Sequence, residues 1–316
     1  MMIYLIFVIL FFIVMLLYFK VAERYNIIDR PNERSSHKEL TIRGGGIIFL
    51  FAALMAVILH TEFWIPVIAM FIIGIISFID DRITLSGKIR IIFHLAAVTL
   101  LFVFLNIFQI FDWWVSVIGY VLVIGIINAY NFMDGINGIT GVYSLIVLCG
   151  LQYLNLQIFN FIHPDMIWLP ILASLVFLFF NFRKKAKCFA GDVGSVTIAF
   201  WIIFLLLKLM LMTGDYSYIL FLSVYGVDSV LTILHRLKLK HNIFDAHRLH
   251  FYQILANEQR WPQLLISSIY GIIQLVIIAI IIFLPVNFAI KFCLTTVPLV
   301  IAYILIKPRM MVITRY

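Results

Sequence analysis

Residues 1–19 read MMIYLIFVILFFIVMLLYF, a run that contains no charged side chain. A transmembrane helix needs about 20 consecutive apolar residues, so this run is long enough to cross a bilayer. It lacks both the basic start and the small-residue cleavage site of a secretory signal peptide. We therefore expect it to be retained as a first membrane span.

Similar apolar runs continue through the rest of the chain. The 316 residues are 64% hydrophobic and 12% charged, whereas soluble domains carry about 25% charged residues. This composition excludes an ordinary soluble domain and predicts an all-α polytopic transmembrane bundle of about 10–11 helices, forming a single domain over residues 1–316. The later runs lie near residues 44–60, 63–79, 91–111, 113–130, 139–158, 167–182, 195–213, 216–234, 263–285 and 288–306.

The basic residues predict the orientation of these helices. If the chain alternates sides from an outer N-terminus, all lysines and arginines except Lys208 and Lys291 fall on the same face. The positive-inside rule makes this face, and with it the C-terminus, cytoplasmic. The opposite loops are too short for a domain. We expect contact with the lipid bilayer, no nucleic-acid partner, and polar chemistry on the cytoplasmic face.

Two polar segments of this face lie in the first third of the chain. Gly44, Gly45 and Gly46 open the second apolar run, and glycines there allow close approach of a neighbouring helix or of a ligand. Asp80 and Asp81 lie side by side at the inner end of the third run. They either project into water beside Arg82 or form part of a site, and ionisable residues at membrane depth favour the second interpretation.

Residues 128–138, NAYNFMDGING, carry a polar side chain at every third position. Residues three apart lie on one face of a helix, so Asn128, Asn131, Asp134 and Asn137 would form a polar wall inside the bundle. Apolar side chains would be cheaper within a membrane, which favours a functional role.

Two further segments complete the set. In residues 190–195, AGDVGS, either Asp192 or Ser195 caps the following helix, or Asp192 holds a divalent cation beside amides that attract phosphate. Residues 245–250, DAHRLH, lack the glutamate of the HExxH zinc motif. There, His247, Arg248 and His250 suit a diphosphate better than a metal.

These motifs, in this order, resemble the polyprenyl-phosphate N-acetylhexosamine-1-phosphate transferases, the MraY/WecA superfamily or glycosyltransferase family 4. The resemblance extends from Pro31 to about Trp261. Where the MraY branch has three consecutive histidines, this chain has His247-Arg248-Leu249-His250. The difference favours the branch that initiates O-antigen, in lipopolysaccharide biosynthesis, or other surface polysaccharides, and it argues against a muramyl-pentapeptide substrate.

The resemblance implies a cytoplasmic active-site cleft in a bacterial inner-membrane enzyme that depends on Mg²⁺, with Mn²⁺ as the alternative. Such an enzyme transfers an N-acetylhexosamine 1-phosphate from a UDP-amino sugar to undecaprenyl phosphate and releases UMP. The sequence leaves open the sugar, the lipid length and the choice between a monomer and a homodimer. The roles implied are catalytic for Asp80, Asp81, Asp134 and His247, metal-binding for Asp192 and Asn131, and substrate-binding for Asn128, Asn137, Arg248 and His250.

The sequence also allows a different class of protein, a membrane transporter of an anionic or lipid-linked solute. Polar residues within spans and a basic cleft would suit such a transporter. Transporters usually place their sites at the bilayer midplane and often contain inverted repeats. Here the acids gather toward one face and no repeat is evident, so the transferase is the favoured prediction.

Overall fold

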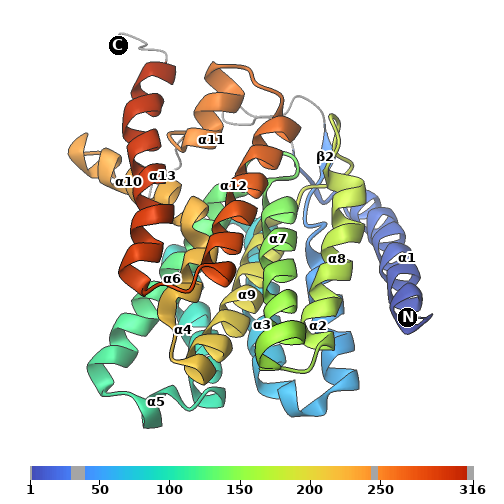
Figure 1. Ribbon diagram of the computed structural model, residues 1–316. Coiled ribbons are helices and arrows are strands. Elements are labelled where there is room, and N and C mark those ends of the chain that lie inside the picture. Colours follow the sequence, from blue (N-terminus) through green and yellow to red (C-terminus); the bar gives the residue numbers. More distant parts are fainter. Residues whose placement is uncertain (1, 30–39, 243–247, 312–316) are drawn as a thin grey trace.

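The computed structural model describes residues 2–29, 40–242 and 248–311, which form a bundle of α-helices (Figure 1). Among these residues, nine helical segments are long and apolar enough to cross a membrane. Two shorter apolar helices accompany them, α2 (Ile47–Leu59) and α8 (Asp165–Asn181). The predicted all-α multi-pass architecture is therefore confirmed, and the two short helices account for spans below the usual length.

The helices follow the predicted apolar runs closely. Helices suit these runs because, in a membrane, every backbone polar group must find its partner within the segment. The nine segments contain α1 (Met2–Arg24), α3 (Trp64–Ile83), α4 (Gly87–Phe104), α6 (Trp113–Met133), α7 (Ile139–Leu154), α9 (Gly191–Thr213), α10 (Ser223–Lys238), α12 (Gln263–Phe283) and α13 (Phe288–Met310). Helices α7 and α10 reach spanning length together with the adjoining helical turns Asn155–Phe159 and Tyr216–Leu222.

Short elements connect or extend these helices. Two residue pairs, β1 (Ile28–Asp29) and β2 (Thr41–Ile42), form an antiparallel ribbon. The short helices are α5 (Ile107–Ile110) and α11 (Phe251–Gln253). The remaining turns are 3₁₀ or π segments, namely η1 (Thr61–Phe63), η2 (Asn155–Phe159), η3 (Tyr216–Leu222) and η4 (Ile254–Glu258).

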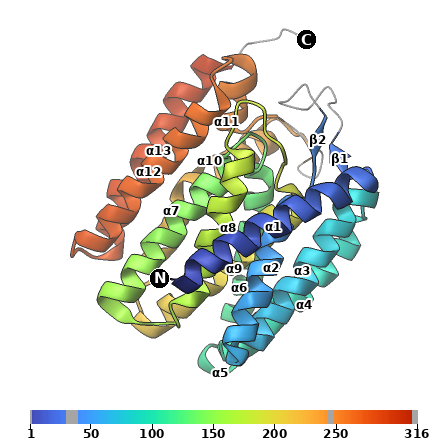
Figure 2. The same ribbon diagram turned by 90° about the vertical axis from the view of Figure 1, so that its right-hand side faces the viewer.

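Helix α9 forms the centre of the bundle. It packs most extensively against α3, and also contacts α6, α7 and α2. The large side chains of Phe200, Trp201 and Phe204 are fully buried along it. At the opposite extreme, α13 lies at the edge and packs mainly on α10 (Figure 2). Because α9 is surrounded by other helices, the residues at its first turn are held by neighbours on several sides.

The two ends of the bundle differ in what they carry. The β1–β2 ribbon, α11 and the last described turn of α13 lie at one end, and α5 lies at the other (Figure 1). The polar segments predicted for the cytoplasmic face border the first end, which we call the ribbon end. The end that carries α5 is called the α5 end.

Candidate active site

Asp81, in the last turn of α3, caps the first turn of α9. Its side chain is fully buried, and its two carboxylate oxygens accept hydrogen bonds from the backbone N–H groups of Asp192 at 3.0 Å and Val193 at 3.2 Å. These amides lie at a helix start, where no carbonyl within the helix can serve them. Asp81 thus uses the anion-binding property of the helix N-terminus to join α3 to α9.

The capping of α9 differs from one of the two sequence interpretations. Helix α9 begins at Gly191 without a side-chain cap from its own sequence. Ser195 instead donates a hydrogen bond from Oγ to Asn131 Oδ1 at 2.9 Å. The prediction that Asp192 or Ser195 caps the helix is therefore wrong, because a carboxylate from another helix occupies the cap position.

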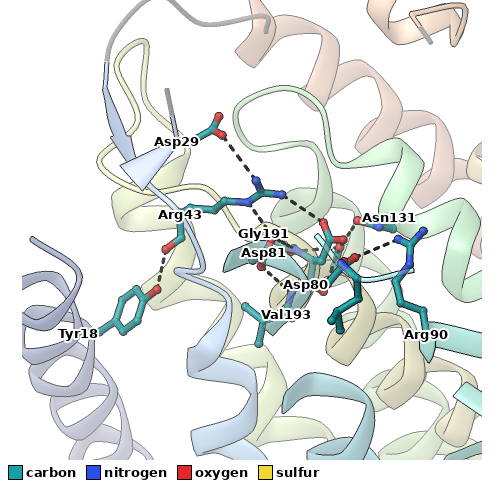
Figure 3. A network of polar contacts seen from close by, with 12 residues as sticks. Tyr18, Asp29, Arg43, Asp80, Asp81, Arg90, Asn131, Gly191 and Val193 are labelled. Carbon is teal, nitrogen blue, oxygen red and sulfur yellow. Dashed lines mark hydrogen bonds and ion pairs between the residues drawn. The ribbon is translucent and has the colours of Figure 1, made fainter. Parts of the chain in front are cut away.

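Arg43, which follows β2, connects three carboxylates around this helix start (Figure 3). Its guanidinium nitrogens lie 2.7 Å from Asp81 Oδ1, 3.6 Å from Asp192 Oδ1 and 3.8 Å from Asp29 Oδ1. The Tyr18 hydroxyl donates a hydrogen bond to the Arg43 carbonyl at 2.6 Å. Sequence reasoning counted Arg43 only as a basic residue; its position directly before the glycine triplet was the available signal.

The glycine triplet brings the start of α2 against the start of α9. Gly45 N–H donates to the Phe189 carbonyl at 2.8 Å, and Gly46 N–H donates to the Ala190 carbonyl at 3.0 Å. A Cβ atom on Gly46 would lie 2.0 Å from Gly194 Cα. The triplet therefore serves close helix packing, one of the two roles expected from the sequence, and this packing positions Arg43 beside Asp192.

Replacing Gly46 with alanine should separate α2 from α9. The obstructing atoms belong to the backbone and cannot rotate away, so we expect a loss of about 1–3 kcal/mol of stability. Thermal unfolding in detergent should show a lower Tm. Gly87→Ala in the first turn of α4 is the matched control, since a Cβ there meets open space. Equal Tm values for the two variants would contradict the packing role.

Asp80 points to a second arginine. Its Oδ2 lies 3.1 Å from a guanidinium nitrogen of Arg90, and its Oδ1 accepts from the Leu85 backbone N–H. The Asp80 side chain is 7% exposed and that of Arg90 is 43% exposed. The neighbouring carboxylates Asp80 and Asp81 therefore each have a cation of their own, which removes the repulsion expected of adjacent acids.

The predicted polar wall is present only in part. Helix α6 ends at Met133, so it contains Asn128 and Asn131 but neither Asp134 nor Asn137. Asn131 faces Ser195 of α9, whereas Asn128 donates to the Ile124 carbonyl of its own helix at 2.8 Å. The prediction of a continuous four-residue helical face is thus wrong, because the chain leaves the helix at the glycine-rich segment that follows.

Beyond the helix, Asn137 links three segments of the ribbon end. Its Nδ2 donates to the Arg183 carbonyl at 2.8 Å, its N–H donates to Gln263 Oε1 at 3.0 Å, and its carbonyl accepts from Ser267 Oγ at 2.7 Å. The side chain is buried. These contacts hold the chain turn between α6 and α7, so the polar groups of Asn137 are used in packing this turn against its neighbours.

Asp134 lies directly after α6, beside the same cluster. Burial raises the pKa of Asp134 to about 7, the neighbouring Asp192 carboxylate adds to the increase, and Arg43 opposes it. The interactions with Asp192 and Arg43 place Asp134 within electrostatic reach of the start of α9. The structure thus brings Asp80, Asp81, Asp134 and Asp192 to one region from three different helices.

The raised pKa of Asp134 predicts a pH-dependent stability. The folded protein holds this proton more tightly than the unfolded chain, so the contribution is complete below about pH 4 and is lost as pH rises through about 7. Asp134→Asn keeps the neutral shape at every pH. In the absence of substrates, its Tm should exceed that of the wild type at pH 8, and the difference should shrink toward pH 5. A difference that grows toward acidic pH would contradict this assignment.

The last motif folds around a buried aspartate of α10. Asp228 accepts hydrogen bonds from the Phe251 N–H at 2.9 Å and the Tyr270 hydroxyl at 2.7 Å, and lies 3.4 Å from His250 Nδ1. His250 is 1% exposed and precedes α11. Asp228 thus orders the residues that follow Arg248, whereas His247 lies outside the described residues. The helical face predicted for His247 and His250 therefore lies partly outside the described residues, and His250 itself directly precedes α11.

The position of the carboxylates along their helices bears on the class of protein. Asp80 and Asp81 end α3, Asp134 follows α6, and Asp192 begins α9. All therefore lie at one end of the bundle, whereas transporters hold their substrates near the bilayer midplane. The fold and the site define a multi-pass membrane protein with an acidic, arginine-neutralised site at one end.

Comparison with known proteins points to a family. The family model for glycosyl transferase family 4 matches residues 63–210, which run from α3 into α9 and include all four acids. Arg43, which neutralises Asp81 and Asp192, precedes the matched region. The central part of the chain is thus similar to glycosyl transferase family 4, which agrees with the resemblance that the motifs indicated.

Curated proteins similar to this chain are named as sugar-1-phosphate transferases. The chain is 26% identical over 256 residues to a probable undecaprenyl-phosphate N-acetylglucosaminyl 1-phosphate transferase of Bacillus subtilis (strain 168), covering 75% of this chain and 71% of the relative. It is 30% identical over 213 residues to the undecaprenyl-phosphate alpha-N-acetylglucosaminyl 1-phosphate transferase of Escherichia coli (strain K12), covering 60% of this chain and 57% of that relative.

Proposed function

We propose that this protein transfers an N-acetylhexosamine 1-phosphate from a UDP-sugar to undecaprenyl phosphate and releases UMP. N-acetylglucosamine and related amino sugars are the proposed cargo, and the product would begin a surface polysaccharide such as O-antigen. The single observation that carries the proposal is the cluster of Asp81, Arg43 and Asp192 at the start of α9. The family-model match and the names of the relatives support it.

The reaction exchanges one phosphoanhydride bond for another. An oxygen of the lipid phosphate forms a bond to the sugar-bearing phosphorus of the UDP-sugar, and the bond from that phosphorus to the oxygen retained by UMP breaks. A phosphate monoester has a second pKa near 6 and is mostly dianionic at neutral pH. The nucleophile therefore needs no strong base, and the main barrier is the approach of two anions.

The contacts of Asp80 and Asp81 support a positioning role for this pair. Asp81 is occupied by Arg43 and two amides, and Asp80 by Arg90 and one amide. Both arginines remain partly exposed. We propose that the two acids fix Arg43 and Arg90, whose charges then offset those of the reacting phosphates. Removing a proton from the lipid phosphate is at most a minor role of Asp80 and Asp81.

The donor atoms around Asp192 fit a magnesium ion. Asp192 offers a carboxylate that is 21% exposed, and Asn131 offers an amide oxygen nearby, next to Ser195. Hard oxygen donors of this kind suit Mg²⁺, with Mn²⁺ as the alternative. We propose Asp192 and Asn131 as the residues that hold it. When bound, the ion would spread the negative charge of the phosphoryl oxygens.

The remaining proposed roles concern the nucleotide half of the substrate. Asp134 would contact the nucleotide, with Asn128 and Asn137 supporting the adjoining chain. His247, Arg248 and His250 would hold the diphosphate, with His247 as the catalytic histidine. Asp228 would then act as a positioning residue, because it fixes the backbone that follows His250. We place this site on the cytoplasmic side of the bacterial inner membrane, since the basic residues predict that orientation.

Membranes that contain the chain provide the test. They are incubated with undecaprenyl phosphate, Mg²⁺ and a panel of labelled UDP-sugars, against membranes that contain the Asp192→Ala variant. The proposal expects lipid-soluble label together with UMP for at least one amino sugar, and neither product from the variant. Label that enters vesicles without becoming lipid-linked would instead support a transporter.

A further inference from the structure

Three potential metal ligands meet at the α5 end, away from the carboxylate site. His60 directly follows α2, His163 lies in the turn before α8, and Asp165 is the first residue of α8. One ligand atom from each residue lies within 4.8 Å of the others. Asn181, at the other end of α8, accepts a hydrogen bond from the Gly138 N–H at 2.7 Å, in the segment that follows Asp134. The 16-residue rise along α8 separates Asp165 from Asn181 by roughly 24 Å. The three potential ligands therefore lie far from the proposed transfer site.

The spacing of these atoms is close to that of a tetrahedral metal centre. Asp165 Oδ2 lies 2.9 Å from His60 Nε2 and 3.6 Å from His163 Nδ1. Zinc bonds to nitrogen and oxygen of about 2.0–2.1 Å at tetrahedral angles put neighbouring ligand atoms about 3.3–3.4 Å apart. These two distances fall on either side of this value, and the two imidazole rings, whose centroids are 3.6 Å apart, would turn toward the shared ion.

His163 Nδ1 accepts a hydrogen bond from the Asp165 backbone N–H at 3.3 Å and faces a carboxylate oxygen of Asp165 at 3.6 Å. The proposed ion would take the place of this hydrogen bond at Nδ1, because an imidazole nitrogen has a single lone pair.

A neighbouring side chain orients one of the ligands, and a carboxylate lies near another. The Tyr4 hydroxyl donates to Asp165 Oδ1 at 2.6 Å, which leaves Oδ2 toward the histidines. Glu62 Oε1 lies 3.9 Å from His60 Nδ1, on the side of the ring away from Asp165. A carboxylate behind a ligating imidazole and a hydrogen bond to a ligating carboxylate are the usual supports of protein metal sites.

We propose that His60, His163 and Asp165 bind a transition-metal ion of the Zn²⁺ class, which ties the end of α2 to the start of α8. Two imidazoles and one carboxylate select Zn²⁺, Cu²⁺ or Ni²⁺ over Mg²⁺ and Ca²⁺, which prefer oxygen. His163 is 46% exposed, so the ion can reach the site from solvent. The ion is a structural clamp on short helices, and Tyr4 extends the clamp to α1.

The test measures zinc affinity on the full chain in detergent, after removal of any affinity tag and of bound metal by a chelator. A chromophoric chelator competes for Zn²⁺, and excess Mg²⁺ is present throughout. His163→Ala removes a half-exposed ligand and Asp165→Asn a second one, while His241→Ala removes an exposed histidine at the ribbon end. Asp192→Ala identifies zinc held by the carboxylate site.

The wild type, His241→Ala and Asp192→Ala should share one tight zinc site that raises Tm, because a ligand bound only by the folded state stabilises it. Tyr4→Phe should weaken this site about 10- to 100-fold, the usual cost of losing an outer support. His163→Ala and Asp165→Asn should weaken it further and abolish the Tm increase. Zinc affinity that survives both ligand variants, or that Asp192→Ala alone removes, would overturn the proposal.

Discussion

Asp192→Ala should lower the rate of sugar-phosphate transfer by about three orders of magnitude, since a bound metal ion supplies several kcal/mol of transition-state stabilisation. The substitution should leave the fold intact, because Asp81 rather than Asp192 caps α9. The rate is measured with purified protein at saturating Mg²⁺, and folding is checked by Tm. The loss should not be recovered by raising the pH.

Asp112→Ala is the matched control for this variant. Asp112 is an exposed aspartate before α6, at the α5 end, and its side chain makes no cap hydrogen bond. Both the activity and the Tm of this control should equal those of the wild type. If Asp192→Ala were as active as Asp112→Ala, Asp192 would have no place in the site.

Arg43→Gln should destabilise the protein by about 3 kcal/mol, the lower end of the cost of removing one partner from a buried ion pair. The lower end applies because Arg43 is 35% exposed, whereas the Asp81 carboxylate that loses its cation is fully buried. The double variant Arg43→Gln/Asp81→Asn removes that uncompensated charge and should recover most of the loss. Thermal unfolding of the four proteins in detergent measures the coupling.

Additive effects of the two substitutions would contradict this coupling. The activity of the double variant provides a second comparison. Since Asp81 is proposed to position Arg43, the double variant should regain stability without regaining transfer. A double variant with restored activity would show that neither Arg43 nor Asp81 serves the reaction.

The sequence predicted the bundle well because the apolar runs are long and almost free of charge. It also predicted that the acids would meet, since alternating spans bring the ends of the third, fifth and eighth runs to one side. The runs at residues 44–60 and 167–182 were already shorter than about 20 residues, and they form the two shorter apolar helices α2 and α8. These two helices pack against each other and against longer helices, which hold them within the bundle.

The sequence could not predict which side chains contact each other, because these contacts join segments that are distant along the chain. Asp81 and the amide of Asp192 are 111 positions apart, and His60 and Asp165 are 105 positions apart. No local pattern reports such pairs. The polar period at residues 128–137 was misleading for a different reason: Gly138 has a φ of +88°, and the chain departs from the helix before the repeat ends.

The central claim is that one phosphate travels with the sugar. Purified protein is given undecaprenyl phosphate, Mg²⁺ and a UDP-amino sugar labelled with ³H in the sugar and ³²P in the sugar-bearing phosphate. Both labels should enter the lipid in equal amounts, with an equal amount of UMP released. Lipid that carries ³H without ³²P, accompanied by UDP, would show transfer of the sugar alone and would contradict the account.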